Sequence, residues 1–157
     1  AANLNSGVQT VVSGTAQALS ELEVKAKEAG ARRALKLAVA GPFHCPLMQE
    51  AADNFKNAIA DVTFNNPTEV LFSNVTGNRA TDGEEIKKNA VLHLTNPVRW
   101  TDEEKVLADM ISADKDNEWC LIEPGVGSVL AGLWAKTPYA EERKCISVNS
   151  VETLANL

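Results

Sequence analysis

Residues 34–48 have the sequence ALKLAVAGPFHCPLM, and this stretch decides the fold class. Over residues 34–39 apolar positions alternate with small or charged ones, a period of two that is typical of a half-buried strand. Gly41 and Pro42 then break the strand, and Pro46 suits the first turn of a helix. The stretch therefore predicts a strand, a turn and a helix in succession, with His44 in the turn.

The same alternation of strands and helices continues on both sides of this stretch. Strands are predicted at residues 11–14, 34–39, 70–75, 119–122 and 145–148, and helices at residues 15–30, 46–59, 84–94 and 101–112 and from residue 128. Strands that alternate with helices indicate an α/β protein with a largely parallel sheet. A weak boundary is expected near residue 40.

Composition excludes several classes of function. The chain has 157 residues, the size of one domain, and a formal net charge of −6, which argues against nucleic-acid binding. No apolar run approaches the roughly 20 residues that a membrane span needs. No basic region is followed by an apolar one, so we expect no secretory signal. The three cysteines match neither a disulfide framework nor a zinc site, so we expect a cytoplasmic protein without a metal.

His44 is the best candidate for chemistry because its turn lies where open α/β sheets place functional groups. A neutral imidazole there can act as a general base. The alternative is a turn histidine that bonds only to its own loop. His93 lies late in a predicted helix, and its side chain is expected to do little.

A base needs a nucleophile, and this chain offers none of the expected kind. The Gly-x-Ser-x-Gly turn that exposes a hydrolase or acyltransferase serine is absent. Cys45 is the immediate neighbour of His44, and such neighbours rarely point at one another. The glycines at residues 125–127 fail the dinucleotide-binding spacing because Leu130 stands where a glycine is needed.

One region is basic although the chain as a whole is acidic. A solvated face is one explanation, and a docking surface for an acidic partner or for phosphates is the other. The residues of this basic cluster are Lys25, Lys27, Arg32, Arg33 and Lys36.

Four motifs in register resemble malonyl-CoA:acyl-carrier-protein transacylases. Residues 2–14 (ANLNSGVQTVVSG) are similar to a strand of that family, and residues 41–48 (GPFHCPLM) are similar to its Phe-His-Ser-Pro-Leu-Met segment. Residues 96–100 (NPVRW) and 123–130 (EPGVGSVL) complete the likeness. Asn5-Ser6-Gly7 lacks the family's usual proline, and Pro124 precedes rather than follows the first glycine, so these two loops are expected to differ.

The resemblance implies a fold and a missing part. Family members are about twice as long, and their first half carries the nucleophilic serine, an oxyanion-hole glutamine and an arginine for the malonyl carboxylate. The chain thus looks like the C-terminal half, with residues 1–39 in a ferredoxin-like small subdomain and residues 40–157 in a hydrolase-like parallel-sheet core. Alone, we expect it to be inactive and to be insoluble or molten, because half of a parallel sheet exposes strand edges and apolar faces.

The resemblance also implies residue roles. His44 would be the catalytic base, and the main-chain carbonyl of His93 would orient it. Phe43 would help select malonyl groups, Asn5 would line the cleft between subdomains, and the basic cluster would face an acidic carrier protein.

Malonyl-CoA, acyl carrier protein and the missing N-terminal half would be the partners, with no resident cofactor and no contact with nucleic acid or membrane. The alternatives are the acyltransferase domain of a polyketide synthase and a non-catalytic binding domain of the same ancestry.

Overall fold

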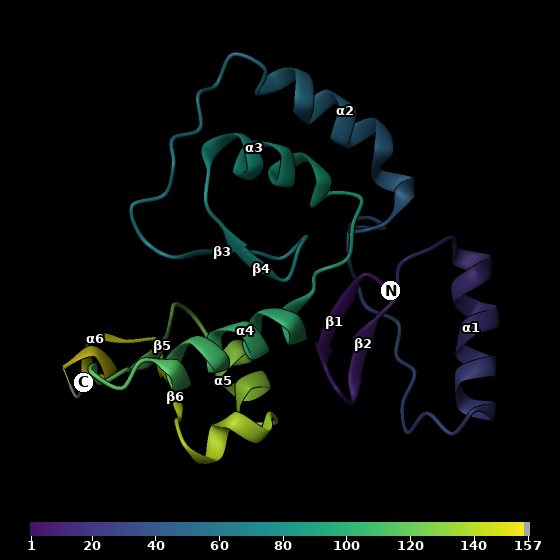
Figure 1. The fold of residues 1–157 in the computed structure, drawn as a ribbon. Coiled ribbons are helices and arrows are strands. Elements are labelled where there is room, and N and C mark those ends of the chain that lie inside the picture. Colours follow the sequence, from purple (N-terminus) through teal and green to yellow (C-terminus); the bar gives the residue numbers. More distant parts are fainter. Residues whose placement is uncertain (156–157) are drawn as a thin grey trace. The chain divides into compact units, whose positions relative to one another are not determined.

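The computed structural model describes residues 1–155, and the chain divides after Trp100 into two compact units. Short strands alternate with helices in both units, so the mixed α/β class is confirmed (Figure 1). The elements of the first unit are β1 (Asn3–Ser6), β2 (Gln9–Val11), α1 (Ala16–Glu28), the 3-10 turn η1 (Pro46–Met48), α2 (Gln49–Ala58), β3 (Leu71–Ser73), β4 (Asn78–Ala80) and α3 (Gly83–Leu92). The elements that follow are α4 (Trp100–Ala113), β5 (Leu121–Pro124), α5 (Val129–Trp134), η2 (Pro138–Glu141), β6 (Cys145–Val148) and α6 (Val151–Leu154).

The first unit begins with an antiparallel hairpin of β1 and β2. Val98 also pairs with β1, through a parallel bridge to Asn3. The main chain of Val98 accepts from Leu4 at 2.9 Å and donates to Ala2 at 2.8 Å. The hairpin is therefore bonded to the segment that follows α3, although most of the first unit separates them in sequence.

Thr15 caps the start of α1, because its Oγ1 accepts from Ala18 N at 3.2 Å, which agrees with the helix predicted from residue 15. The prediction of a strand after α1, over residues 34–39, is wrong for this structure. Residues 34–39 form coil, and Leu35, Leu37 and Val39 are 76%, 57% and 64% exposed. A strand needs a hydrogen-bonded neighbour, and none of the described strands pairs with this segment.

The middle of the first unit is a β-hairpin next to two packed helices. Strands β3 and β4 pair antiparallel, and Gly77 turns the chain between them with a φ of 65°. Helix α2 packs against α3. Asp82 caps α3 by accepting from Glu85 N at 2.8 Å. These contacts fix the direction of α3, whose far end reaches the site described below.

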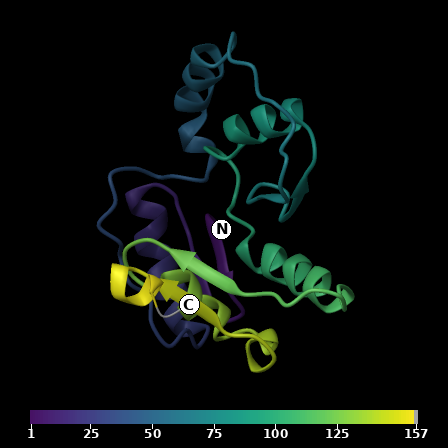
Figure 2. The same cartoon turned by 90° about the vertical axis from the view of Figure 1, so that its left-hand side faces the viewer.

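The second unit is built on a parallel pair, β5 and β6, which lie side by side in both views (Figures 1 and 2). Helix α5 packs on both strands. The register places Ile122 opposite Ile146, and these side chains are 43% and 42% exposed. Among the described strands this is the only parallel pair, so the largely parallel sheet that we expected is present only in part.

The buried apolar core is thin and consists mainly of small side chains. Across residues 1–155 no large side chain is less than 2% exposed. The buried apolar residues are Ala2, Ala52, Ala80, Ala108, Ile111, Leu133 and Trp134. The division into a ferredoxin-like part (1–39) and a hydrolase-like part (40–157) stays a prediction. Within the described part of the chain, no helix has the length and apolar character needed to cross a bilayer.

Candidate active site

His44 has an unusual backbone conformation. Its φ is 60°, the left-handed region that side chains with a Cβ rarely adopt. The main-chain N–H of His44 donates to Leu94 O at 3.1 Å, and the adjacent thiol of Cys45 donates to Pro42 O at 3.1 Å. Strained conformations of this kind persist only where neighbours hold them, and they concentrate at functional sites.

The side chain of His44 is held in one tautomer. Its Nδ1 lies 2.8 Å from the main-chain oxygen of His93. A carbonyl oxygen can only accept, so Nδ1 carries the proton and donates it. In the neutral ring Nε2 then has the free lone pair, which is the arrangement of a general base.

The end of α3 supplies this carbonyl. Helix α3 ends at Leu92, and Asn96 closes the turn beyond it because its Nδ2 donates to Leu92 O at 2.8 Å. The last carbonyls of a helix have no partner inside the helix. His93 O belongs to this group and is bonded by His44 instead. The structure thus brings together the two histidines that the resemblance paired.

The ring of His93 also lies against His44, a contact that no local pattern in the sequence indicates. The two ring centroids are 4.7 Å apart, and the ring planes are tilted by 38°. Burial lowers the pKa of His93, and the charge of His44 lowers it further. Its Nε2 is buried without a hydrogen-bond partner. The ring of His93 therefore lies against the candidate base, with its pKa shifted in the direction that favours the neutral form.

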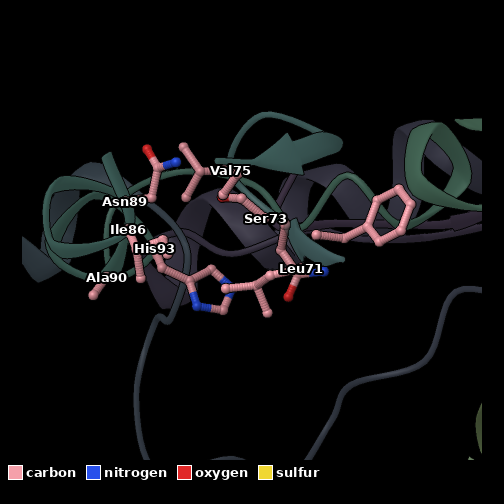
Figure 3. A pocket seen from close by; sticks show the side chains of 10 residues that line it. Leu71, Ser73, Val75, Ile86, Asn89, Ala90 and His93 are labelled. Carbon is pink, nitrogen blue, oxygen red and sulfur yellow. The ribbon is translucent and has the colours of Figure 1, made fainter. Parts of the chain in front are cut away.

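A hollow of about 180 Å³ lies beside His93 (Figure 3). One wall is α3 and the residue after it, which contribute Ile86, Asn89, Ala90 and His93, and the other wall is β3 with the residues around it. The lining is largely apolar and contains neither a carboxylate nor a lysine. His93 thus contacts the His44 ring and also lines the hollow.

Phe43 and Asn5 lie in the same unit as His44. Phe43 precedes His44 in the turn and is 45% exposed, with its ring 3.7 Å from the position a Cβ on Gly41 would take. Asn5 is half-buried on β1, next to Leu4, which bonds to Val98. The structure gives neither side chain a contact with the His44 ring, so their roles stay predictions.

The basic cluster is exposed on the surface of α1 and of the coil after it. Within it, Lys27 Nζ bonds to Glu23 at 2.7 Å, which partly neutralises that end of the helix. The remaining members lie at residues 25, 32, 33 and 36 and are exposed. The position is compatible with docking and equally with a solvated face.

The glycine loop at residues 125–127 has a structural explanation. Glu123 accepts from Leu130 N at 2.9 Å and from Ala131 N at 2.8 Å. The Ala131 N–H foremost, and then the Leu130 N–H, lower the pKa of Glu123. The amides that a phosphate would need are therefore bonded to the chain's own carboxylate. Among the described residues, no group of histidine, cysteine and acidic side chains could hold a metal ion.

Comparison with known proteins supports the resemblance along nearly the whole chain. No family model matches. The malonyl CoA-acyl carrier protein transacylase of Haemophilus influenzae is 38% identical over 151 residues, which are 96% of this chain and 46% of that protein. The chain is homologous to about half of such a transacylase. It spans about half the length of the curated relatives it matches.

Solved structures agree with this homology. An acyl carrier protein S-malonyltransferase from Vibrio cholerae matches with a TM-score of 0.85 and 37% identity, covering 99% of this chain and 48% of that one. A malonyl-transacylase in complex with its type II PKS acyl-carrier protein matches with a TM-score of 0.88 and 32% identity, with the same coverage. The small sheets and helices of this chain therefore have the arrangement found in malonyl transacylases.

Proposed function

We propose that this chain supplies the histidine-bearing C-terminal half of an acyltransferase that moves a malonyl group from coenzyme A to acyl carrier protein. The serine that carries the malonyl ester would come from a companion half of the enzyme. The observation that carries the proposal is the bond of 2.8 Å between His44 Nδ1 and His93 O, because it leaves Nε2 free as a base.

In the first half-reaction, Nε2 of His44 takes the proton of the companion serine while the serine oxygen attacks the malonyl thioester carbonyl. The tetrahedral intermediate then expels the thiolate of coenzyme A. The proton on Nε2 passes to that sulfur, which leaves the serine malonylated and His44 neutral again.

In the second half-reaction, the pantetheine thiol of the carrier protein enters. Nε2 of His44 removes the thiol proton, and the sulfur attacks the serine ester. When the ester breaks, the serine oxygen recovers the proton from Nε2. Malonyl-CoA and the phosphopantetheinyl carrier protein are substrates in this scheme, and no resident cofactor is needed.

A main-chain carbonyl holds the histidine differently from the aspartate of a Ser-His-Asp triad. It keeps the tautomer correct, as the aspartate does, but it carries a dipole in place of a full negative charge. The carbonyl belongs to the main chain, so substitutions of the His93 side chain leave it in place. Phe43 and Asn5 are proposed to contact the malonyl group and the cleft, and the basic cluster is proposed to face the carrier protein.

Exposed apolar surface supports a companion half. Ile122 and Ile146 lie opposite each other on one face of the parallel β5–β6 pair and are 43% and 42% exposed. Parallel strands are normally covered on both faces. We propose that the companion half covers this face, and that the chain alone is therefore inactive. A cytoplasmic location follows from the proposed role in fatty acid synthesis.

The test supplies the companion half in trans. The N-terminal half of the Haemophilus influenzae relative is mixed with this chain, and malonyl transfer from coenzyme A to carrier protein is measured. The pair should transfer malonyl groups, and His44→Ala should lower the rate by about two to four orders of magnitude, which is the contribution of a positioned acid or base.

A matched control separates chemistry from assembly. Asn54→Ala changes an exposed position on α2 and should transfer at the wild-type rate. His44→Ala should still bind the companion half, as checked by gel filtration. An unchanged rate for His44→Ala would remove this histidine from the mechanism, and a pair that binds without any transfer would favour a non-catalytic binding domain.

A further inference from the structure

The base of the proposed reaction is held by a single hydrogen bond from its ring. The bond between His44 Nδ1 and His93 O fixes one atom of the imidazole. This bond leaves room for small changes in the χ1 and χ2 torsions of His44, and such changes would move Nε2, the atom that transfers the proton. Catalytic geometry tolerates little displacement, so a second contact on the ring is needed to define where Nε2 points.

The ring of His93 is that second contact. It lies 4.7 Å from the His44 ring, centroid to centroid, with a tilt of 38°. An aromatic face in this position limits how far the neighbouring ring can turn. His93 therefore contacts His44 twice, once through the main-chain oxygen and once through the imidazole.

This inference rests on the proposed function and assigns a role in it to one more side chain. We propose that His93 is a positioning residue, whose side-chain ring packs against His44 and holds Nε2 in line for proton transfer. The contact serves only while His93 is uncharged, because His44 becomes an imidazolium in each half-reaction and a second cation against it would oppose that step.

The surroundings of His93 favour its neutral form, because burial lowers the pKa of this ring. Apart from His93 itself, the residues that line the hollow carry no titratable side chain, and the His44 ring is the titratable group against it. In Figure 3 the His93 ring extends from α3 toward Leu71. A phenylalanine at position 93 keeps an aromatic ring there and carries no charge.

The experiment uses this chain assembled with the N-terminal half of the Haemophilus influenzae relative, which is added at a saturating concentration. His93→Ala keeps the main-chain oxygen and removes the ring, so kcat should fall about ten- to a hundredfold while the KM for malonyl-CoA stays unchanged. His93→Phe restores an aromatic face without a charge and should recover most of the wild-type kcat.

The matched control is Lys88→Ala, which changes an exposed position on the same helix α3 and leaves the His93 ring in place. It should keep the wild-type kcat. The proposal is overturned if His93→Ala keeps the wild-type kcat, if His93→Phe is as slow as His93→Ala, or if Lys88→Ala is equally slow.

A spectroscopic readout is independent of activity. In assemblies labelled with ¹⁵N-histidine, the imidazole nitrogens of His44 should report one tautomer with a protonated Nδ1 in the wild type. They should report a mixture of tautomers or broadened signals in His93→Ala, and a single tautomer again in His93→Phe. If the wild-type pair fails to transfer malonyl groups, the proposed function fails, and these spectra still decide whether the His93 ring orders His44.

Discussion

Replacing Gly83 by alanine should destabilise the chain far more than a single methyl group ordinarily does. Gly83 is the first residue of α3, and it is buried against the main chain of Phe64. A Cβ there would overlap Phe64 O and would lie 2.6 Å from Phe64 C and 3.0 Å from Asn65 C. Carbon atoms prefer separations of about 3.5–4.0 Å, so the backbone would have to move by roughly 1 Å.

The size of the effect follows from these contacts. Forcing extra atoms into a packed site costs about 1–3 kcal/mol. The movement also breaks the bond of 2.9 Å from Gly83 N to Asn66 Oδ1, and a hydrogen bond of this type contributes about 0.5–1.5 kcal/mol. We therefore expect Gly83→Ala to lower the free energy of unfolding by about 2–4 kcal/mol. Because α3 leads to the carbonyl that holds His44, malonyl transfer should fall as well.

The assay is equilibrium urea unfolding of the chain assembled with the companion half, followed by far-ultraviolet circular dichroism. Gly132→Ala is the matched control, because Gly132 is exposed on α5 and a Cβ added to it would meet nothing within 4 Å. That change should stabilise by about 0.5–1 kcal/mol through the better helix propensity of alanine. If Gly83→Ala changes the free energy of unfolding by less than about 0.5 kcal/mol, the usual range of a neutral surface substitution, the packing argument is wrong.

Two further predictions concern pH. The folded state lowers the pKa of His93 below its ordinary 6.5, foremost through burial, so the unfolded chain binds more protons in acid. The contribution of His93 to stability should therefore be complete above pH 6.5 and should fall as the pH drops toward the folded pKa. In urea unfolding at a series of pH values, His93→Phe should reduce the dependence of the free energy of unfolding on pH. The folded state also lowers the pKa of Glu123 below its ordinary 4.5, because main-chain N–H groups of α5 donate to its carboxylate. The stability that this carboxylate contributes should be present above pH 4.5 and should be lost as the pH falls through the folded pKa. In the same titrations, Glu123→Gln should be less stable at neutral pH, and its free energy of unfolding should depend less on pH in the acid range.

Local chemistry in the sequence predicts much of the first unit and part of the site. The helix that starts near Thr15, the strand that ends before Gly77 and the helix that ends before Asn96 depend on neighbouring residues, and all three are found. The turn that carries His44 is predictable for the same reason. The ring contact between His44 and His93 joins residues 49 apart in sequence, and no local pattern reports how two such side chains meet. The sequence does not predict the role of Glu123. Its carboxylate accepts from main-chain N–H groups seven and eight residues later in the chain, and no standard capping motif has this spacing.

The strand predicted at residues 34–39 fails for a different reason, and that reason bears on the function. Its alternation of apolar and polar residues is a property of a chain that pairs with neighbours and covers one face. The structure shows this segment as exposed coil, with Leu35 76% exposed. Ile122 and Ile146 lie in regular strands, and their side chains are also partly exposed to solvent. The alternation of apolar and polar residues reflects how a segment is buried in a whole fold. This chain spans about half the length of the transacylases that it matches. We propose that this disagreement between sequence pattern and burial marks two surfaces that a companion half covers.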